Sequence, residues 1–247
     1  VPERSVAFDE KPGKISDMFK ALFKNDQAMT VVVSIILVYT SLNICGNLVL
    51  YFFRFDVGNE GAYSIFAAVA FAAQVLVMMV IPLLRKRFSK SQLFISGFVI
   101  QIAGFAVILI MAFAKLYTPQ SWYILCLPGI LIYLGYGMLN VIMTIFLSDS
   151  VDYGEVMNGT REESVIFSMQ TFTVKLASGV AVFLAGLVVD WIHLDTAAAV
   201  QTQDTLDALR MWMTIPSVIL LIVGIFVFKR FYKLDDTRME EIKSKLN

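Results

Sequence analysis

The chain has 247 residues, of which 58% are hydrophobic and 16% charged, and its mean hydropathy is +0.73. Ordinary globular domains are about 45–50% apolar, so this excess, gathered in long blocks, excludes a simple soluble domain and indicates an integral membrane protein. The twenty basic and twenty acidic side chains balance. A net charge of zero gives no reason to expect a nucleic-acid partner.

The first 27 residues are polar and contain no apolar core, so we expect no cleavable signal peptide. Five apolar residues recur there at helical spacing, with lysines beside them: Ile15, Met18, Phe19, Leu22 and Phe23, flanked by Lys14, Lys20 and Lys24. This pattern predicts a short amphipathic helix that lies on the inner leaflet or links two membrane bundles. The missing initial methionine fits a piece of a larger protein.

Six apolar stretches follow, each long enough to cross a bilayer as a helix. They cover residues 28–53, 62–84, 93–114, 123–147, 165–189 and 209–228. About 20 apolar residues span the hydrocarbon layer, and a helix satisfies all of its own backbone hydrogen bonds there. The predicted fold is therefore an all-α integral membrane protein, with a six-helix bundle over residues 28–228 and a tail over residues 229–247.

The distribution of basic residues predicts the orientation. If both termini lie on one side, that side has sixteen of the twenty lysines and arginines, the other side has three, and Lys175 lies within a span. By the positive-inside rule both termini are cytoplasmic, and we expect a bacterial-type inner membrane. The basic turn at residues 85–90 is then explained as a topology anchor. Residues 237–246 are predicted to form a short surface helix without chemistry.

The fifth span contains the strongest candidate for a functional site. Lys175 lies about 15 Å deep, where a charge costs at least ~2.5 kcal/mol, so we expect it to face a protein interior or a water-filled passage. Thr171 and Ser178 share its helical face, and Gln170 lies beside them. Alternatively, Lys175 pairs with a carboxylate and only holds helices together. This chain offers no carboxylate at that depth, so such a partner would come from elsewhere.

Two further spans have weaker polar stripes with four-residue spacing. The first span carries Tyr39, Asn43 and Asn47, and the fourth carries Tyr136 and Asn140. Amides and phenols suit a sugar site, because they bind hydroxyl groups and offer aromatic faces to the C–H side of the ring. The alternative is interhelical hydrogen bonding, which contributes about 0.6 kcal/mol per pair.

The predicted inner loop at residues 148–164 is rich in acids. Its acids are Asp149, Asp152, Glu155, Glu162 and Glu163, opposed by Arg161. Acidic residues contribute little to topology, so another role is expected, and pairing with basic loops of a partner half is favoured over metal binding. No second histidine or cysteine stands near His193, so no metal site is expected.

A longer pattern then resembles a known family. The run Asp-Ser-Val-Asp-Tyr-Gly-Glu at 149–155, followed by Gly159, Arg161-Glu162, Phe-Ser-Met-Gln-Thr at 167–171 and Lys175, is similar to the signature of the glycoside–pentoside–hexuronide:cation symporters. This is the melibiose-carrier branch of the major facilitator superfamily. The pattern covers about thirty residues. Val156 and Met157 depart from it, since many members have an aromatic and a basic residue there.

The resemblance implies that the six spans are helices seven to twelve of a twelve-helix carrier. Lys175, with Gln170 and Thr171, then corresponds to residues close to the sugar and cation sites. The loop residues correspond to a cytoplasmic switching loop, formed by Asp149, Asp152, Tyr153, Glu155, Arg161 and Glu162. The carboxylates that bind the coupling cation lie on helices two and four, in an N-terminal half that this chain lacks.

We therefore expect Na⁺- or H⁺-coupled symport of a sugar, glycoside or hexuronide by alternating access. The expected partners are membrane lipid, the sugar and the N-terminal half, with no cofactor and no catalytic residue. One alternative is a six-span scaffold or assembly subunit without transport, whose polar stripes face one another without water. Another is an intramembrane enzyme, which would need a histidine, metal or nucleophile constellation that the sequence does not show.

Overall fold

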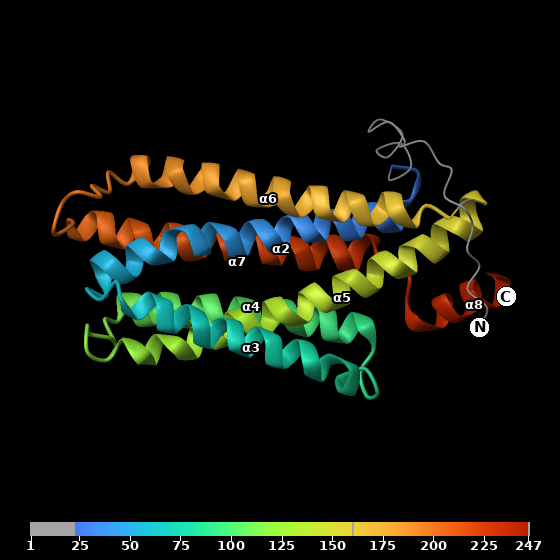
Figure 1. The fold of residues 1–247 in the computed structure, drawn as a ribbon, viewed down its shortest axis with the longest axis horizontal. Helices are drawn as coiled ribbons and strands as arrows, with labels where there is room; N and C mark the ends of the chain where they lie inside the picture. The colour runs from blue at the N-terminus through green and yellow to red at the C-terminus, as the bar shows by residue number, and fades with distance from the viewer. Residues whose placement is uncertain (1–22, 160, 247) are drawn as a thin grey trace.

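A computed structural model shows the chain as a bundle of long helices (Figure 1). The structure describes residues 23–159 and 161–246, apart from the side chain of Lys245. Its elements are α2 (Asp26–Tyr51), the π-helical turn η1 (Phe52–Asp56), α3 (Ala62–Leu84), α4 (Lys90–Phe113), the 3₁₀ turn η2 (Trp122–Leu125), α5 (Cys126–Asn158), α6 (Glu163–Trp191), α7 (Gln203–Phe231) and α8 (Asp236–Leu246). The amphipathic helix predicted at 15–23 lies almost wholly outside the described residues.

Six of these helices are long and apolar enough to cross a membrane, which confirms the predicted all-α, six-span fold. Three of them begin at side-chain caps that satisfy free backbone N–H groups. Asn25 accepts from the N–H of Ala28, and Thr202 accepts from that of Thr205. Ser89 and Gln92 form a capping box at the start of α4. These caps fix where the polar turns end and the spans begin.

The prediction for the fourth span was wrong at its C-terminal end. Residues 148–158, expected in a loop, continue α5 as helix, and α5 ends at Gly159, whose φ of 73° is the left-handed conformation typical of a C-cap. The sequence of this extension is polar, so apolar length alone places it outside the span. Its acidic side chains Asp149, Asp152 and Glu155 form ion pairs within the chain.

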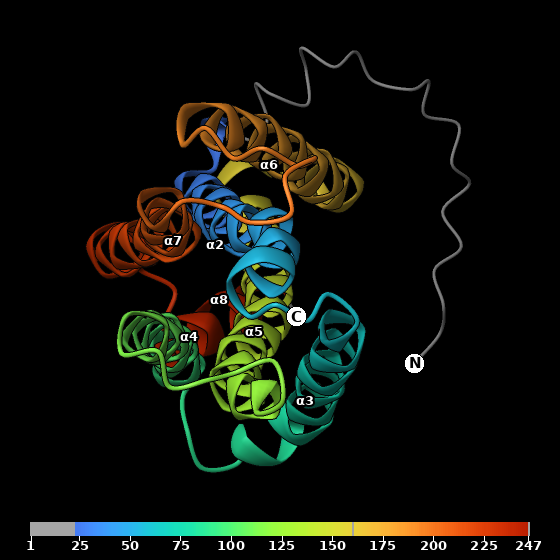
Figure 2. The same cartoon turned by 90° about the vertical axis from the view of Figure 1, so that its left-hand side faces the viewer.

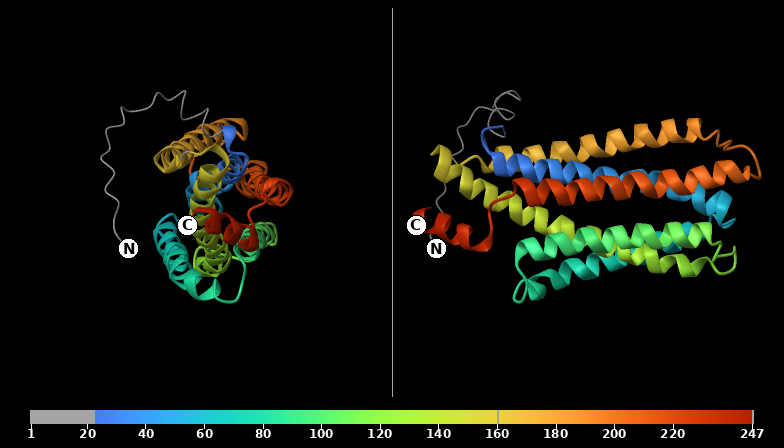
Figure 3. Two further views of the ribbon diagram at one scale, coloured as in Figure 1. Left: turned by 90° about the vertical axis from the view of Figure 1, so that its right-hand side faces the viewer. Right: turned by 180° about the vertical axis from the view of Figure 1, so that it is seen from behind.

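The six spanning helices form two groups of three. Helix α2 packs against α6 and α7, while α5 packs against α3 and α4, and α4 and α7 join the two groups. Viewed along the helices, α3 and α6 stand apart at the two ends of one side, with α2 and α5 between them (Figure 2). We call the two ends of the bundle the α8 end and the η1 end; the views from the other directions show α8 beside the end of α5 (Figure 3).

Close backbone contact and aromatic packing hold the helices together. A Cβ atom on Gly135 of α5 would lie 2.5 Å from the carbonyl oxygen of Gly97 in α4, so these helices touch through glycine. Near the α8 end, the ring of Phe94 packs 5.1 Å from that of Phe146 and 4.5 Å from that of Phe228. This cluster joins α4, α5 and α7 in one core.

Candidate functional site

The polar stripes of α2 and α5 meet near the middle of the bundle. The side-chain nitrogen of Asn140 donates a hydrogen bond of 2.6 Å to the hydroxyl oxygen of Tyr39. The rings of Tyr39 and Tyr136 lie edge to face with their centroids 5.5 Å apart. The sequence predicted both stripes, and the structure shows that they belong to one group. We call Tyr39, Asn43, Asn47, Tyr136 and Asn140 the central polar face.

The central polar face lies on the side of α2 that is turned away from α7. Ser41 marks the opposite side, because Ser41 and Ser217 each donate a hydrogen bond to the other's carbonyl oxygen, at 3.0 and 2.8 Å. Tyr39 lies two residues before Ser41, which is about 200° around the helix. The face is therefore not covered by α7, and Tyr39 and Asn140 are only half-buried.

The two other amides of the stripe bond within their own helix. The nitrogen of Asn43 donates to the carbonyl oxygen of Tyr39, and that of Asn47 donates to the carbonyl oxygen of Asn43, both at 2.7 Å. One N–H of each amide is thus used, and the second N–H and the amide oxygen remain to donate to and accept from a ligand. Tyr51 continues the same four-residue spacing, a signal that the sequence analysis did not use.

Lys175 lies on the face of α6 opposite the face that packs on α2. Thr173 and Ala177 are buried, and Lys175 is two residues from each, about 160–200° around the helix. Lys175 and Thr171 are exposed, while Gln170 and Ser178 are half-buried. No hydrogen bond or ion pair joins Lys175 to any of the described residues. The described part of the chain does not enclose its ammonium, so a protein or water-filled surrounding for Lys175 stays a prediction.

At the α8 end, Asp149 is buried and forms an ion pair with Lys90. Asp236 of α8 shares this lysine, with 3.4 Å between its Oδ1 and the Lys90 Nζ, and also pairs with Arg85 at 3.2 Å. Asp149 is therefore paired inside this chain, and Arg85 and Lys90 of the basic turn bind acids. Pairing of the acidic segment with a partner half and the role of the basic turn as a topology anchor stay predictions.

The charges around Asp236 set its ionisation. Burial alone raises the pKa of this carboxyl group, but the Lys90 and Arg85 cations outweigh burial and hold the pKa below its usual range. Asp236 is therefore negatively charged at neutral pH. The α8 helix is thus bound electrostatically to the start of α4, so the expected surface helix without chemistry is in fact part of an ion-pair cluster.

The other acids of the predicted switching loop gather around Arg161. Its guanidinium lies 3.0 Å from Asp152, 2.9 Å from Glu155 and 3.1 Å from Glu163. The hydrogen bond that Arg161 donates to Glu155 is the main cause of the raised Arg161 pKa. The Arg161 side chain is 47% exposed, so these pairs are solvated and contribute little to stability. Glu162 precedes α6 without capping it through its side chain.

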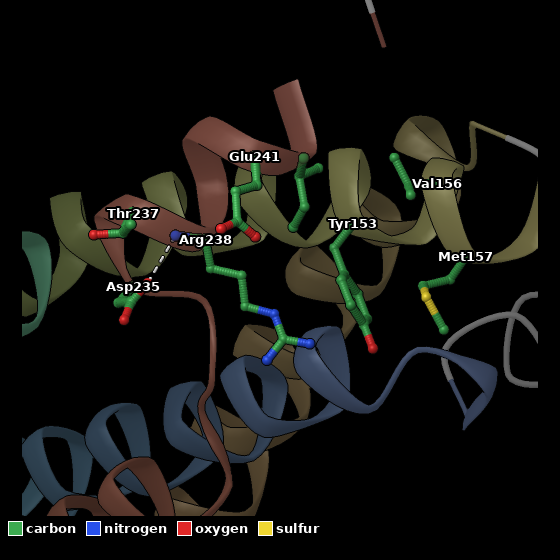
Figure 4. Close-up of a pocket in the computed structure, with 8 residues that line it drawn as sticks. Tyr153, Val156, Met157, Asp235, Thr237, Arg238 and Glu241 are labelled. Carbon is green, nitrogen blue, oxygen red and sulfur yellow. Dashed lines mark hydrogen bonds between the residues drawn. The ribbon is translucent and has the colours of Figure 1, made fainter. Parts of the chain in front are cut away.

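Tyr153 connects the end of α5 to α8. With Val156 it packs against a small apolar cluster of α8 and the segment before it, formed by Leu234, Met239 and Ile242. A cavity of about 440 Å³ lies alongside, and Figure 4 shows Tyr153 and Arg238 pointing from its wall toward the start of α2. The α5 extension is therefore stabilised by tertiary packing, which its polar sequence does not reveal.

Two more positions of the 149–155 run, Ser150 and Gly154, have a structural role. The side-chain nitrogen of Asn25 donates a 2.7 Å hydrogen bond to the carbonyl oxygen of Ser150. A Cβ atom on Gly154 would lie 2.8 Å from that same nitrogen. The glycine therefore lets the cap of α2 approach α5, and the run fixes how these two helices meet at the α8 end.

A buried ion pair at the η1 end was missed by the sequence analysis. Arg210 of α7 makes two hydrogen bonds to Asp56, one of them 2.7 Å from Nε to Oδ2, and both side chains are 3% exposed. Asp207 binds the same guanidinium at 2.6 Å, and the Tyr117 hydroxyl donates to Asp56 at 2.9 Å. The partners are 154 residues apart, so no local pattern could have predicted the pair.

The fold is that of a multi-pass membrane protein, and comparison with known proteins shows its family. A family model described as MFS/sugar transport protein matches residues 3–236. The chain therefore belongs to this family of the major facilitator superfamily.

Three curated relatives illustrate the similarity. The symporter YjmB of Bacillus subtilis is 25% identical over 233 residues, which cover 94% of this chain and 49% of the relative. The raffinose carrier protein of Pediococcus pentosaceus is 23% identical, covering 94% and 35%, and the isoprimeverose transporter of Lactiplantibacillus pentosus is 25% identical, covering 90% and 44%. The chain thus spans about half or less of the length of these relatives.

Proposed function

We propose that this chain is the C-terminal half of a cation-coupled sugar symporter with both termini in the cytoplasm of a bacterial-type inner membrane. The observation that carries the proposal is the central polar face, where Asn140 binds Tyr39 on the side of the bundle between α3 and α6. Relatives named as raffinose and isoprimeverose carriers support a sugar as the substrate. An N-terminal half would cover this side and enclose the sugar between the two bundles.

Depth along the bundle supports a shared role for the face and Lys175. Tyr39 lies 13 residues from the start of α2, and Lys175 lies 12 residues from the start of α6. Both helices start at the α8 end, so the two side chains stand about 18–20 Å from that end. A sugar held by amides and phenols of α2 and α5 would therefore be bound at the same level as the ammonium.

Lys175 would supply the charge through which sugar and cation binding are coupled. Its ammonium needs an anionic or aqueous partner at mid-membrane, and it makes no ion pair with the described residues. We propose that carboxylates of the N-terminal half, which would hold the main Na⁺ or H⁺ site, provide this partner. Lys175 would then compete with the cation, or bind the carboxylate of an acidic sugar.

Alternating exposure of the sugar site to the two sides of the membrane would involve the acidic C-terminal end of α5. Asp149, Asp152, Tyr153, Glu155, Arg161 and Glu162 stay our proposed switching group. The buried ion pair of Asp149 with Lys90, which Asp236 of α8 shares, supports a rigid α5 end that moves together with α4 and α8. We propose that this unit separates from the N-terminal half when the carrier opens to the cytoplasm.

The test replaces Lys175 in the full-length carrier and measures uptake of radiolabelled sugar into membrane vesicles. Lys175→Ala should abolish uphill accumulation, because the counter-charge in the coupling site is lost. The matched control is Lys115→Ala, which removes an exposed lysine from the turn after α4 and should accumulate sugar as the wild type does. Unchanged accumulation in Lys175→Ala would reject the assignment.

A scaffold without transport also predicts a hydrogen bond between the stripes, and Asn140 and Tyr39 make one. The exposed Lys175 and Thr171 favour the carrier, because a scaffold gains nothing from an uncompensated charge at mid-span. The two functions separate in the same assay, since a scaffold takes up no sugar in any cation gradient.

A further inference from the structure

A polar cavity lies between α2 and α6, nearer the η1 end than Tyr39 and Asn140, and it shares Asn47 with the central polar face. Its volume is about 350 Å³, within the range of small-ligand pockets. Asn47 and Tyr51 line it from α2, and Val182, Ala185, Gly186, Val189 and Asp190 line it from α6. From Tyr39 to Asn47 and Tyr51 is two to three turns of α2, about 12–18 Å along the helix.

Asp190 is in an unfavourable place for an acid. It lies in the last turn of α6, where the helix dipole disfavours negative charge, and that turn contains no basic residue. No ion pair is formed by Asp190 with the residues that the structure describes. Because no salt bridge within the described residues occupies this exposed carboxylate, its oxygens are available to accept hydrogen bonds from a ligand.

The opposite wall presents complementary groups. One N–H of the Asn47 amide donates to the carbonyl oxygen of Asn43, and the amide oxygen is available to accept from a ligand. The ring of Tyr51 stacks on Phe55, with 6.5 Å between centroids and 8° between planes, and Arg54 lies 4.9 Å from the Phe55 ring. Tyr51 is thereby held in place at the cavity.

The space around Gly186 on the α6 wall is open. A Cβ atom built on Gly186 would meet nothing within 4 Å. The cavity therefore combines a carboxylate, an amide oxygen and a phenol around a gap wide enough for a sugar ring. Hydroxyl groups of a neutral sugar donate to such acceptors, and a carboxylate can accept from two adjacent hydroxyls at once.

We infer that this cavity is a second sugar subsite, which holds a hydroxyl-rich substrate on the η1 side before it reaches the central polar face. The inference rests on the proposed function and names an additional binding site for the same substrate. Asp190 and Asn47 accept hydrogen bonds from the sugar, Tyr51 binds a further hydroxyl, and Gly186 leaves room for the ring.

The first test measures sugar influx in vesicles made with the full-length carrier. Radiolabelled raffinose, isoprimeverose and lactose are compared, and the sugar that the wild type accumulates fastest is used. Asp190→Asn keeps the size of the side chain but removes its charge, and should raise the influx KM about fivefold, since hydrogen bonds to charged groups are the strong ones. The matched control is Asp204→Asn, an exposed acid in the first turn of α7 outside the cavity, which should leave KM unchanged.

The second test locates the sugar directly. Gly186→Cys places a thiol in the cavity, and the sugar should protect it from a membrane-impermeant maleimide. In the double variant Gly186→Cys/Asp190→Asn the sugar concentration for half-protection should rise by the same factor as KM. If the protection is caused only by closure of the carrier around sugar bound at the central polar face, it would instead persist unchanged in the double variant at sugar concentrations that saturate uptake.

The outcomes separate this inference from the proposed function. If the wild type accumulates none of the three sugars, both are overturned. If it accumulates sugar but Asp190→Asn and Asp204→Asn have the same KM, the subsite alone is overturned. A changed half-saturating cation concentration with an unchanged sugar KM would assign Asp190 to the cation and would also overturn the sugar subsite.

Discussion

The buried ion pair at the η1 end gives the sharpest prediction for stability. Asp56→Asn removes the carboxylate that accepts two hydrogen bonds from Arg210, while both side chains are 3% exposed. Removing one member of a buried pair costs about 3–5 kcal/mol, because the remaining charge is left uncompensated. Arg210 keeps Asp207, whose side chain is 38% exposed, so we expect the lower limit, about 3 kcal/mol.

This loss converts to a measurable shift in Tm. A chain of this size loses about 2–4 °C per kcal/mol, so the expected decrease is about 6–12 °C. Unfolding of the purified protein in detergent can be followed with a fluorogenic maleimide, because Cys45 is buried in α2 and reacts only on unfolding. Glu60→Gln is the matched control, since its pair with Arg54 is long and exposed and contributes about 0–1 kcal/mol. A Tm for Asp56→Asn within 2 °C of the control would refute the reasoning.

Two further predictions concern the α8 end. Gly154→Ala should lower Tm in the same assay, because its Cβ would lie 2.8 Å from the Asn25 side-chain nitrogen. Gly46→Ala is the control and should not lower Tm, because the space around Gly46 is open. Equal Tm values for the two variants would count against this contact. Asp236 has a lowered pKa in the folded chain, so it stabilises the fold above the ordinary carboxyl pKa, and this contribution is lost as the pH falls through the lowered value. Asp236→Asn should therefore reduce Tm at pH 7 and make the decrease of Tm with falling pH smaller than in the wild type. Thermal melts between pH 7 and pH 3 measure both effects. Parallel curves of Tm against pH for mutant and wild type would contradict the lowered pKa.

The spans could be predicted from sequence because hydrocarbon thickness demands a minimum apolar length. The predicted range 62–84 coincides with α3 for this reason. The α5 extension could not be predicted in this way, since residues 148–158 are polar and are held in a helix by contacts with distant segments. Lys90, for example, neutralises Asp149 from 59 residues away.

The site shows the same division between local and distant information. Four-residue spacing correctly placed Tyr39 with Asn43, and Tyr136 with Asn140, on helical faces. Spacing cannot tell which stripes meet, and the 2.6 Å hydrogen bond from Asn140 to Tyr39 joins residues 101 positions apart. Lys175 was found from its charge alone, and its partner stays a prediction because it makes no ion pair with the residues that the structure describes.

The central claim is that this chain is half of a carrier in which sugar and cation move together. The most direct measurement is accumulation of radiolabelled sugar by the full-length carrier in vesicles, with an inward gradient of Na⁺ or of H⁺ imposed separately. The account predicts that one of these gradients drives the internal sugar above its external concentration, and that the matching ionophore abolishes this excess. Uptake that stops at equal concentrations in both gradients, or no uptake at all, would contradict it.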